Sequence, residues 1–305
     1  MTPTATINRA ALTTDQRLPF AISTRGFLLT ASDLDMIRIV YEYRLLHIDH
    51  VSALTSRSYK KAHGRLLKLV QNHYLARIEL PFQKHIYVIG REGINVLVEQ
   101  GIASRELIEW RLRHHELKEL FLRHQLMLVD LHCMLELAGK NTGVKLATWR
   151  EGKELWENVT TWHNRERVSL PVCPDAFFTL QDNARPEGRN RLNFFLEADR
   201  STTTHKRFQN KLIAYRQYME DGRHIEKYGI KAFRVVTFTL TKERAESLND
   251  AAREVIPTEA LKYFLFASVE GLSITTPEPI LSSIFMSPRE PRTQKQRLVP
   301  ELREA

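Results

Sequence analysis

Cysteine, glycine and long hydrophobic runs are scarce in this sequence, and each shortage excludes a class of protein. Its 305 residues hold two cysteines, Cys133 and Cys173, which lie far apart in apolar neighbourhoods. This fits a reducing compartment and excludes a disulfide framework and a cysteine zinc cluster. No segment approaches the roughly 18 apolar residues of a membrane span, and residues 1–19 lack the apolar block of a secretory signal. With 12 glycines and no internal repeat, collagenous and solenoid folds are excluded. We expect a two-domain cytoplasmic protein with no membrane partner.

Acidic residues are missing from one stretch of an otherwise balanced first half. The net charge of +9 favours a polyanionic partner. From His50 to Ile78 there is no Asp or Glu but six Lys or Arg. If residues 57–70 form a helix, its apolar residues share one side: Tyr59, Ala62, Leu66, Leu67, Leu69 and Val70. The other side is basic, with Arg57, Lys60, Lys61, Arg65 and Lys68.

The elements around this basic helix predict a winged-helix domain within residues 30–102. A helix from Ser32 or Asp33 to Tyr43 and a short helix over 48–54 precede it, and two β-prone runs, 74–80 and 84–89, follow as a hairpin. In such a domain the third helix enters the major groove of double-stranded DNA, so its basic side chains would meet phosphates. Base edges would be approached by Ser56, Ser58 and His63, and the wing would present Gln83, Lys84 and His85. The other interpretation is a solvated basic face on a small helical domain.

The remaining helical pattern predicts a bridging helix over residues 103–139, between two flexible tails at 1–22 and 288–305. The narrow apolar stripe of its first half can also pair two subunits, so a homodimer stays open. Four histidines lie on the helix, but no carboxylate or cysteine completes a metal-ligand spacing, so they are interpreted as core or interface residues: His114, His115, His124 and His132.

Residues 140–287 alternate short apolar runs with turn residues, which predicts an α/β sandwich and an α+β protein overall. The expected strands cover 144–149, 173–180, 193–198, 233–240 and 263–267, and the expected helices cover 204–219 and 242–255.

Carboxylates gather at two of these strands. Asp175 begins one strand, and Glu197 and Asp199 lie two residues apart at the end of the next, hence on one face. We expect the three to converge as oxygen ligands for Mg²⁺ or Mn²⁺, which suits metal-assisted phosphodiester hydrolysis. Lys211 and Tyr215, four apart on the following helix, share a face, and Lys211 would stabilise charge on the phosphate. Lesser candidates for that part are Arg200 and His205, and the other interpretation is a structural ion network.

Three segments carry a family resemblance. Pro174-Asp175, then FFLEADRST from Phe194, then NKLIAYRQY from Asn210, resemble the PD-(D/E)XK nuclease superfamily. With the preceding winged helix and long helix, the order looks like the replication-relaxation family of bacterial plasmids and mobile elements, over roughly residues 30–285. The resemblance implies a DNA-binding front end and a nuclease-like back end acting in plasmid or mobile-element DNA metabolism.

The chain departs from the superfamily pattern at one position. Asp199 stands where the superfamily usually has a lysine two residues after the acid, so the resemblance leaves catalysis open, with Lys211 as the substitute from the adjacent helix. A glutamate from the first core helix would correspond to Glu119 or Glu136, with Glu151 as a third candidate.

Three functions follow from these patterns. The first is a plasmid or mobile-element DNA-binding protein with a nuclease-like second domain. The second is a Mg²⁺- or Mn²⁺-dependent endonuclease using Asp175, Glu197, Asp199 and Lys211. The third is a dimeric transcriptional repressor whose second domain only dimerises or senses a ligand.

Overall fold

The chain forms two compact units, residues 1–117 and 118–305, which are described separately. The computed structural model describes residues 23–24, 27–79, 83–104, 119–163, 166–201 and 203–300. The expected tail at 1–22 lies outside these residues, and so do residues 105–118, the first half of the expected bridging helix. The homodimer prediction rests on that half and stays a prediction.

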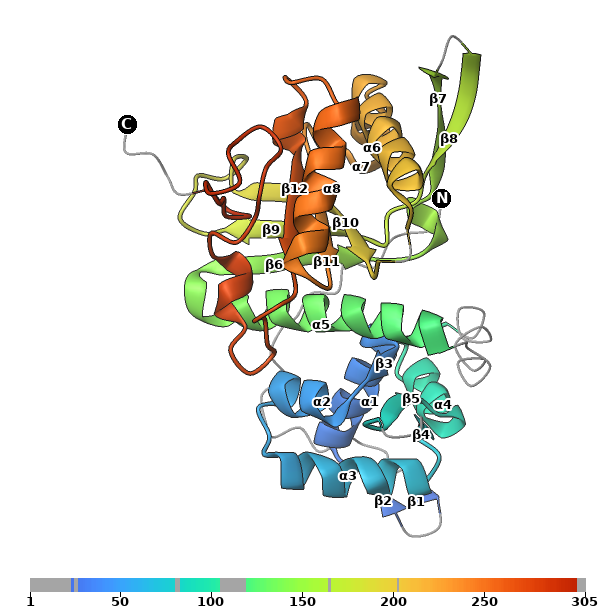
Figure 1. The fold of residues 1–305 in the computed structure, drawn as a ribbon. Helices are drawn as coiled ribbons and strands as arrows, with labels where there is room; N and C mark the ends of the chain where they lie inside the picture. Colours follow the sequence, from blue (N-terminus) through green and yellow to red (C-terminus); the bar gives the residue numbers. More distant parts are fainter. Residues whose placement is uncertain are drawn as a thin grey trace. The chain divides into compact units, whose positions relative to one another are not determined.

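The first unit has three helices followed by a β-hairpin (Figure 1). Its three-stranded sheet is antiparallel, in the order β3-β5-β4. A small ladder of β1 and β2 precedes the helices. The elements are β1 (Ser23–Thr24), β2 (Phe27–Leu28), α1 (Ala31–Tyr43), β3 (Leu45–Leu46), α2 (Ile48–Thr55), α3 (Tyr59–Gln71), β4 (Leu75–Ile78), β5 (Ile86–Ile89) and α4 (Arg91–Glu99). This is the order of helices and hairpin that the sequence predicts.

Two details of this unit differ from the prediction. The N-cap of α1 is Thr30 rather than Ser32 or Asp33, because Thr30 and Asp33 form a capping box in which the Asp33 carboxylate accepts from the Thr30 amide at 2.7 Å. Helix α4 was not predicted. It packs so closely on the start of β4 that a Cβ at Gly93 would lie 2.1 Å from the Tyr74 carbonyl oxygen, so only glycine fits there.

The second unit is built on a five-stranded sheet with the order β12-β11-β10-β9-β6. β6, β9 and β10 pair antiparallel, whereas β10, β11 and β12 pair parallel. No helix among the described residues is long and apolar enough to cross a membrane. The elements are α5 (Glu119–Thr142), β6 (Val144–Arg150), η3 (Lys153–Leu155), β7 (Glu157–His163), β8 (Glu166–Val172), β9 (Ala176–Asp182), β10 (Arg191–Asp199), α6 (His205–Glu220), α7 (Arg223–Tyr228), β11 (Arg234–Thr239), α8 (Lys242–Val255), η4 (Leu261–Tyr263), β12 (Phe264–Ser268) and η5 (Glu278–Leu281).

Helices cover both faces of this sheet. α5 packs on one face, and α6 and α8 on the other (Figure 1). Along β10 the side chains alternate between the two cores: Phe194 and Leu196 join the α5 side, and Phe195 joins the α6 side. Glu197 and Asp199 therefore face α6 and α8. Because α5 packs against β6 and η5, the described part of the expected bridging helix belongs to the second unit.

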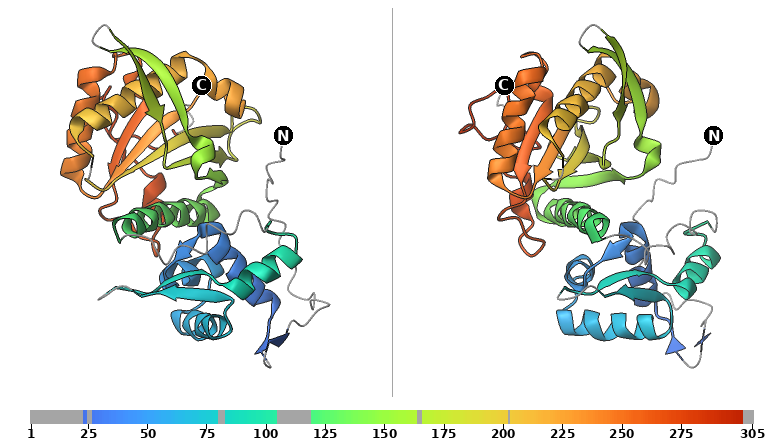
Figure 2. Two further views of the ribbon diagram at one scale, coloured as in Figure 1. Left: turned by 90° about the vertical axis from the view of Figure 1, so that its right-hand side faces the viewer. Right: turned by 45° about the vertical axis from the view of Figure 1, so that its right-hand side comes forward.

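An antiparallel hairpin of β7 and β8 separates β6 from β9, where the sequence predicts no strand. Val159 and Val172 anchor it in the core beside α6, while the far ends of both strands project beyond the body of the unit in the two views of Figure 2.

Residues 288–300 correct the expectation of a flexible C-terminal tail. Leu298 is fully buried in the core on the α5 side, and Gln296 pairs with Phe285. Arg234 donates to the Leu298 carbonyl oxygen at 2.6 Å, and Arg253 donates to that of Pro288 at 2.8 Å. Arginine–carbonyl hydrogen bonds and one apolar side chain hold this segment in place. Because such contacts leave no periodic pattern among the prolines and charged residues, the sequence does not predict the packing.

Candidate functional sites

Helix α3 presents an exposed basic face. Its N-cap is Ser58, which has an extended backbone. Its buried stripe is narrow, formed by Ala62, Leu66 and Leu69. The basic side chains Lys60, Lys61 and Lys68 are exposed, and Arg57 is partly exposed. Among the described residues none of these four forms an ion pair. Tyr59 and Leu67 were expected on the apolar side but are exposed, because the stripe covers a narrower arc than half the helix.

Arg65 is a correction to the predicted basic face. Its guanidinium forms a two-point ion pair with Asp33, whose side chain is only 1% exposed, and it lies 4.8 Å over the ring centroid of Phe27. The hydrogen bond and charge of Asp33 raise the pKa of Arg65 against the opposing effect of burial. Arg65 neutralises a buried carboxylate and joins α3 to α1. It is therefore not available to contact DNA, although the sequence predicts that contact.

The structure describes the other predicted DNA contacts of this unit except those at the tip of the expected wing. Lys84 pairs with Asp49 of α2 and remains 64% exposed at its side chain. On α3, the rings of Tyr59 and His63 stack with centroids 6.3 Å apart. Residues 80–82, at the tip of the expected wing, lie outside the described residues.

Asp175 and Glu197 come together where β9 begins and β10 ends. The Asp175 amide donates to the Leu196 carbonyl oxygen at 3.0 Å, and Oδ2 of Asp175 accepts from the Ala198 amide at 2.8 Å. Oδ1 lies 3.1 Å from Nε2 of His124 on α5. These contacts fix the Asp175 carboxylate against β10.

Glu197 is buried and contacts Lys211 and Tyr215, which share one face of α6. Lys211 forms an ion pair with Oε2, and the Tyr215 hydroxyl donates to Oε1 at 2.6 Å. Burial raises the pKa of Glu197; the Lys211 charge opposes this, and Asp175 adds to it. Burial alone would lower the pKa of Lys211, but the charges of Glu197 and Asp175 raise it to about 12.

Asp199 does not join this pair, which corrects the expected convergence of three carboxylates. Its Oδ2 accepts from Nε of Arg244 on α8 at 2.7 Å, and its Oδ1 accepts from the Ser201 amide at 3.0 Å. Within the described ranges, no three His, Cys, Asp or Glu side chains are placed to hold a metal ion. The spacing put Asp199 on the correct face, but Arg244, 45 residues away, engages it.

The residue that α5 supplies beside the carboxylates is His124, not one of the expected glutamates. Glu119 pairs with Arg123, and Glu151 accepts from the Trp149 indole at 2.7 Å. Glu136 lies 12 residues from His124, roughly 18 Å along the helix. The sequence signal for His124 was a histidine on the apolar stripe of a helix. It was interpreted as a core or interface residue, but it contacts Asp175.

The carboxylates around His124 raise its pKa. Burial lowers its pKa, but the hydrogen bond and charge of Asp175, together with the charge of Glu197, outweigh burial and give a net rise. Cys173 lies beside the same groups; burial and the charge of Glu197 raise the pKa of its thiol. The site therefore combines two carboxylates with a lysine and a histidine whose pKa values are both raised.

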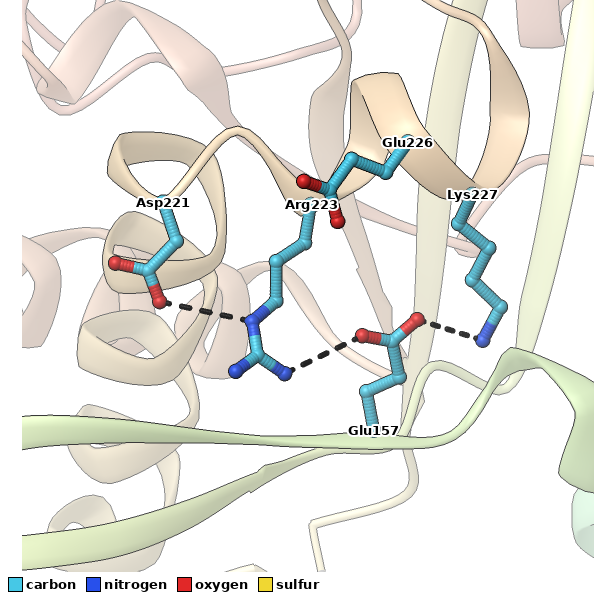
Figure 3. Close-up of a pocket in the computed structure, with 5 residues that line it drawn as sticks. All are labelled: Glu157, Asp221, Arg223, Glu226 and Lys227. Atoms are coloured by element: carbon cyan, nitrogen blue, oxygen red, sulfur yellow. Dashed lines mark ion pairs between the residues drawn. The ribbon is translucent and has the colours of Figure 1, made fainter.

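A separate concavity of about 680 Å³ lies where β7 meets α7 (Figure 3). Glu157 pairs with Lys227 at 2.8 Å and with Arg223 at 3.6 Å, and Arg223 also pairs with Asp221 at 3.7 Å. These charges neutralise one another and attach the hairpin to α7, which is a structural arrangement.

Comparison with known proteins gives one family match. The family model described as replication-relaxation matches residues 37–233. No curated protein matches the chain. Among solved structures, the chain is similar to a transcriptional regulator from Thermotoga maritima, with 23% identity over 32% of this chain and 70% of that one, at a TM-score of 0.22. A score this low assigns no fold or function to the chain.

Proposed function

Because the chain belongs to the replication-relaxation family, we propose that it binds double-stranded DNA of a plasmid or mobile element and acts in its replication or relaxation. In this proposal the first unit is a winged helix that places α3 in the major groove. Lys60, Lys61 and Lys68 then contact phosphates.

The observation that carries this proposal is the exposed, carboxylate-free face of α3. Ion pairs compensate many of the other surface cations, as Arg292 is compensated by Glu246 and Asp250. On α3 the three lysines have no acidic partner among the described residues, so their counterions are free to be exchanged for DNA phosphates. The stacked Tyr59 and His63 lie on the same helix and add surface suited to bases or sugars.

The test is the salt dependence of binding to duplex DNA. Lys61→Ala and Lys68→Ala should each weaken binding. Each should also make the negative slope of log affinity against log salt shallower by about 0.9. Arg91→Ala is the matched control, since Arg91 is also exposed and stands at the start of α4. Unchanged slopes in both lysine variants would show that this face does not contact the DNA.

A second candidate function, a metal-dependent endonuclease, is favoured by the convergence of Asp175, Glu197 and Lys211. Two carboxylates fit a Mg²⁺ or Mn²⁺ ion that takes its remaining ligands from water and substrate phosphate. All four carboxylate oxygens already hold hydrogen-bonding partners, so a metal would share them or displace some. Asp199, held by Arg244, is not a third ligand in this arrangement. A bound metal would polarise the phosphate, and Lys211 would stabilise the charge that develops on it.

The endonuclease is tested with supercoiled plasmid and Mn²⁺ or Mg²⁺. Wild-type protein should give nicked or linear product, and Asp175→Asn and Glu197→Gln should abolish cleavage while DNA binding is retained. Cleavage that survives both changes would refute the site. Plasmid that is bound but uncut by wild type would leave a DNA-binding protein on an inactive scaffold.

A further inference from the structure

A second group of cations lies at the edge of the second unit next to Asp175. Arg200 directly follows β10, and its Nη1 donates to the Arg123 carbonyl oxygen of α5 at 3.3 Å. Arg123 is compensated only by Glu119 in an exposed pair one turn away, and Arg200 pairs with no carboxylate among the described residues. Burial and the neighbouring charge of Arg123 both lower the pKa of Arg200. Two like charges are thus held together, and Glu119 pairs with one of them, Arg123.

The first turn of α6, the helix that follows β10 in the chain, carries two more cations. Lys206 and Arg207 are exposed and, within the described part of the chain, have no acidic partner. They stand at the helix N-terminus, where the helix dipole disfavours cations, and no acidic residue accompanies them in that turn. From Arg200 to Met219 the sequence contains no Asp or Glu. These two cations therefore go against the preference for acidic residues at a helix N-terminus, with no gain in stability. Such a departure is typical of a binding surface.

Hydrogen bonds hold the described residues on either side of Arg200. Arg244 donates to Asp199 at 2.7 Å and to the Thr203 carbonyl oxygen at 2.5 Å, so one guanidinium engages both of these residues. Ser201 has a left-handed backbone with φ of 64° and donates its amide to Asp199. Asp199, expected as a metal ligand, accepts hydrogen bonds from the Ser201 amide and from Arg244.

We propose that Arg123, Arg200, Lys206 and Arg207 form a cationic edge that binds the phosphodiester backbone of duplex DNA, as a second contact beside Asp175 and Glu197. The inference rests on the DNA binding proposed above and adds a contact made by the second unit. A guanidinium suits this part because its fork can donate two hydrogen bonds to one phosphate. DNA held here would lie next to the carboxylate pair whether or not that pair cleaves it.

The experiment measures duplex affinity of the full chain across a salt series. Arg200→Ala and the double variant Lys206→Ala/Arg207→Ala should weaken binding, and each lost phosphate contact should lower the slope by about 0.9. Arg200→Lys should keep most of the slope, which separates charge from folding. The matched control is Arg189→Ala: Arg189 is exposed and lies in the turn at the opposite end of β9 and β10.

The outcomes separate this inference from the proposed function. If Lys61→Ala lowers the slope and the Arg200 and Lys206/Arg207 variants do not, the cationic edge is refuted while α3 remains the DNA contact. If Arg200→Ala and Lys206→Ala/Arg207→Ala lower it while Lys61→Ala and Lys68→Ala do not, the cationic edge is supported and the α3 face is refuted. An equal decrease for Arg189→Ala would show a general charge effect and refute the edge.

Discussion

Helices α3 and α6 are both rich in basic residues, and on each of them one cation is committed to a buried acid while others stay exposed. Both carry several basic residues in segments without a carboxylate. On α3 the lysines are exposed and only Arg65 turns inward to a buried acid, whereas on α6 Lys211 pairs with the buried Glu197 and keeps 36% of its own side chain exposed. Whether a cation is free or committed is decided by a partner 32 residues away in one case and 14 in the other. Composition predicts a basic helix, but not which of its charges remain available to a ligand.

The largest effect is expected where a committed cation is removed from α6. Lys211→Met leaves Glu197, 4% exposed at its side chain, without its counter-charge, and should destabilise the second unit by about 3–5 kcal/mol. Urea unfolding followed by tryptophan fluorescence measures this, since Trp149, Trp156 and Trp162 lie in that unit. The double variant Glu197→Gln/Lys211→Met should recover most of the loss. Equal losses in the single and double variants would contradict a buried ion pair.

A similar but smaller loss is expected on α3. Arg65→Met leaves Asp33 buried, but the capping bonds from Thr30 still satisfy part of its carboxylate, so we expect about 3 kcal/mol. Hydrogen exchange of α1 and α3 peptides, compared with that of Asp33→Asn/Arg65→Met, reports the loss locally. Exchange unchanged in Arg65→Met would return Arg65 to the DNA-binding face.

The same pair predicts how the first unit responds to acid. Burial alone would raise the pKa of Asp33, but the bonds from Arg65 and Thr30 and the Arg65 charge outweigh it and lower the pKa. Since the folded pKa lies below the unfolded one, the stabilisation is present above the unfolded pKa of about 4 and is lost as the pH falls through the folded value. The difference in α1 protection between wild type and Asp33→Asn/Arg65→Met should therefore shrink from pH 7 to pH 3. A constant difference would contradict this linkage.

The smallest stability effect is expected for a free cation. Lys61→Ala should change the free energy of unfolding by less than about 0.5 kcal/mol, because Lys61 is exposed and has no acidic partner among the described residues. The same variant should lower the salt slope of DNA binding, so function and stability separate at this position. Urea unfolding that shifts as much as for Arg65→Met would remove the distinction between the two side chains.

Periodicity predicted most elements of the sheet and helices because each buries an apolar face. The strands β6, β9, β10, β11 and β12 all fall within a few residues of their predicted ranges. The β7–β8 hairpin was missed because Pro171 interrupts a strand pattern and the packing partner, α6, lies further along the chain. Its pairing is set by tertiary contacts that no local pattern contains.

Helix spacing predicted which side chains of α6 share a face at the candidate site, but not which residues engage Asp175 and Asp199. The meeting of Glu197 with Lys211 and Tyr215 follows from helix periodicity once the strand is known. The engagement of Asp199 by Arg244 and of Asp175 by His124 joins elements 45 and 51 residues apart, and many partners were compatible with the same pattern. The roles of these residues in cleavage remain a prediction, which the plasmid assay tests.

The hydrogen bond from the Ala198 amide to Asp175 makes one backbone proton a spectroscopic reporter. An amide bound to a carboxylate resonates downfield, and its shift changes when that carboxylate is protonated, coordinated or displaced. In an ¹⁵N-labelled sample this single resonance would register occupation of the carboxylate pair by a cation or by a DNA phosphate, without any turnover. The chain thus carries its own internal probe, on the central strand of its sheet.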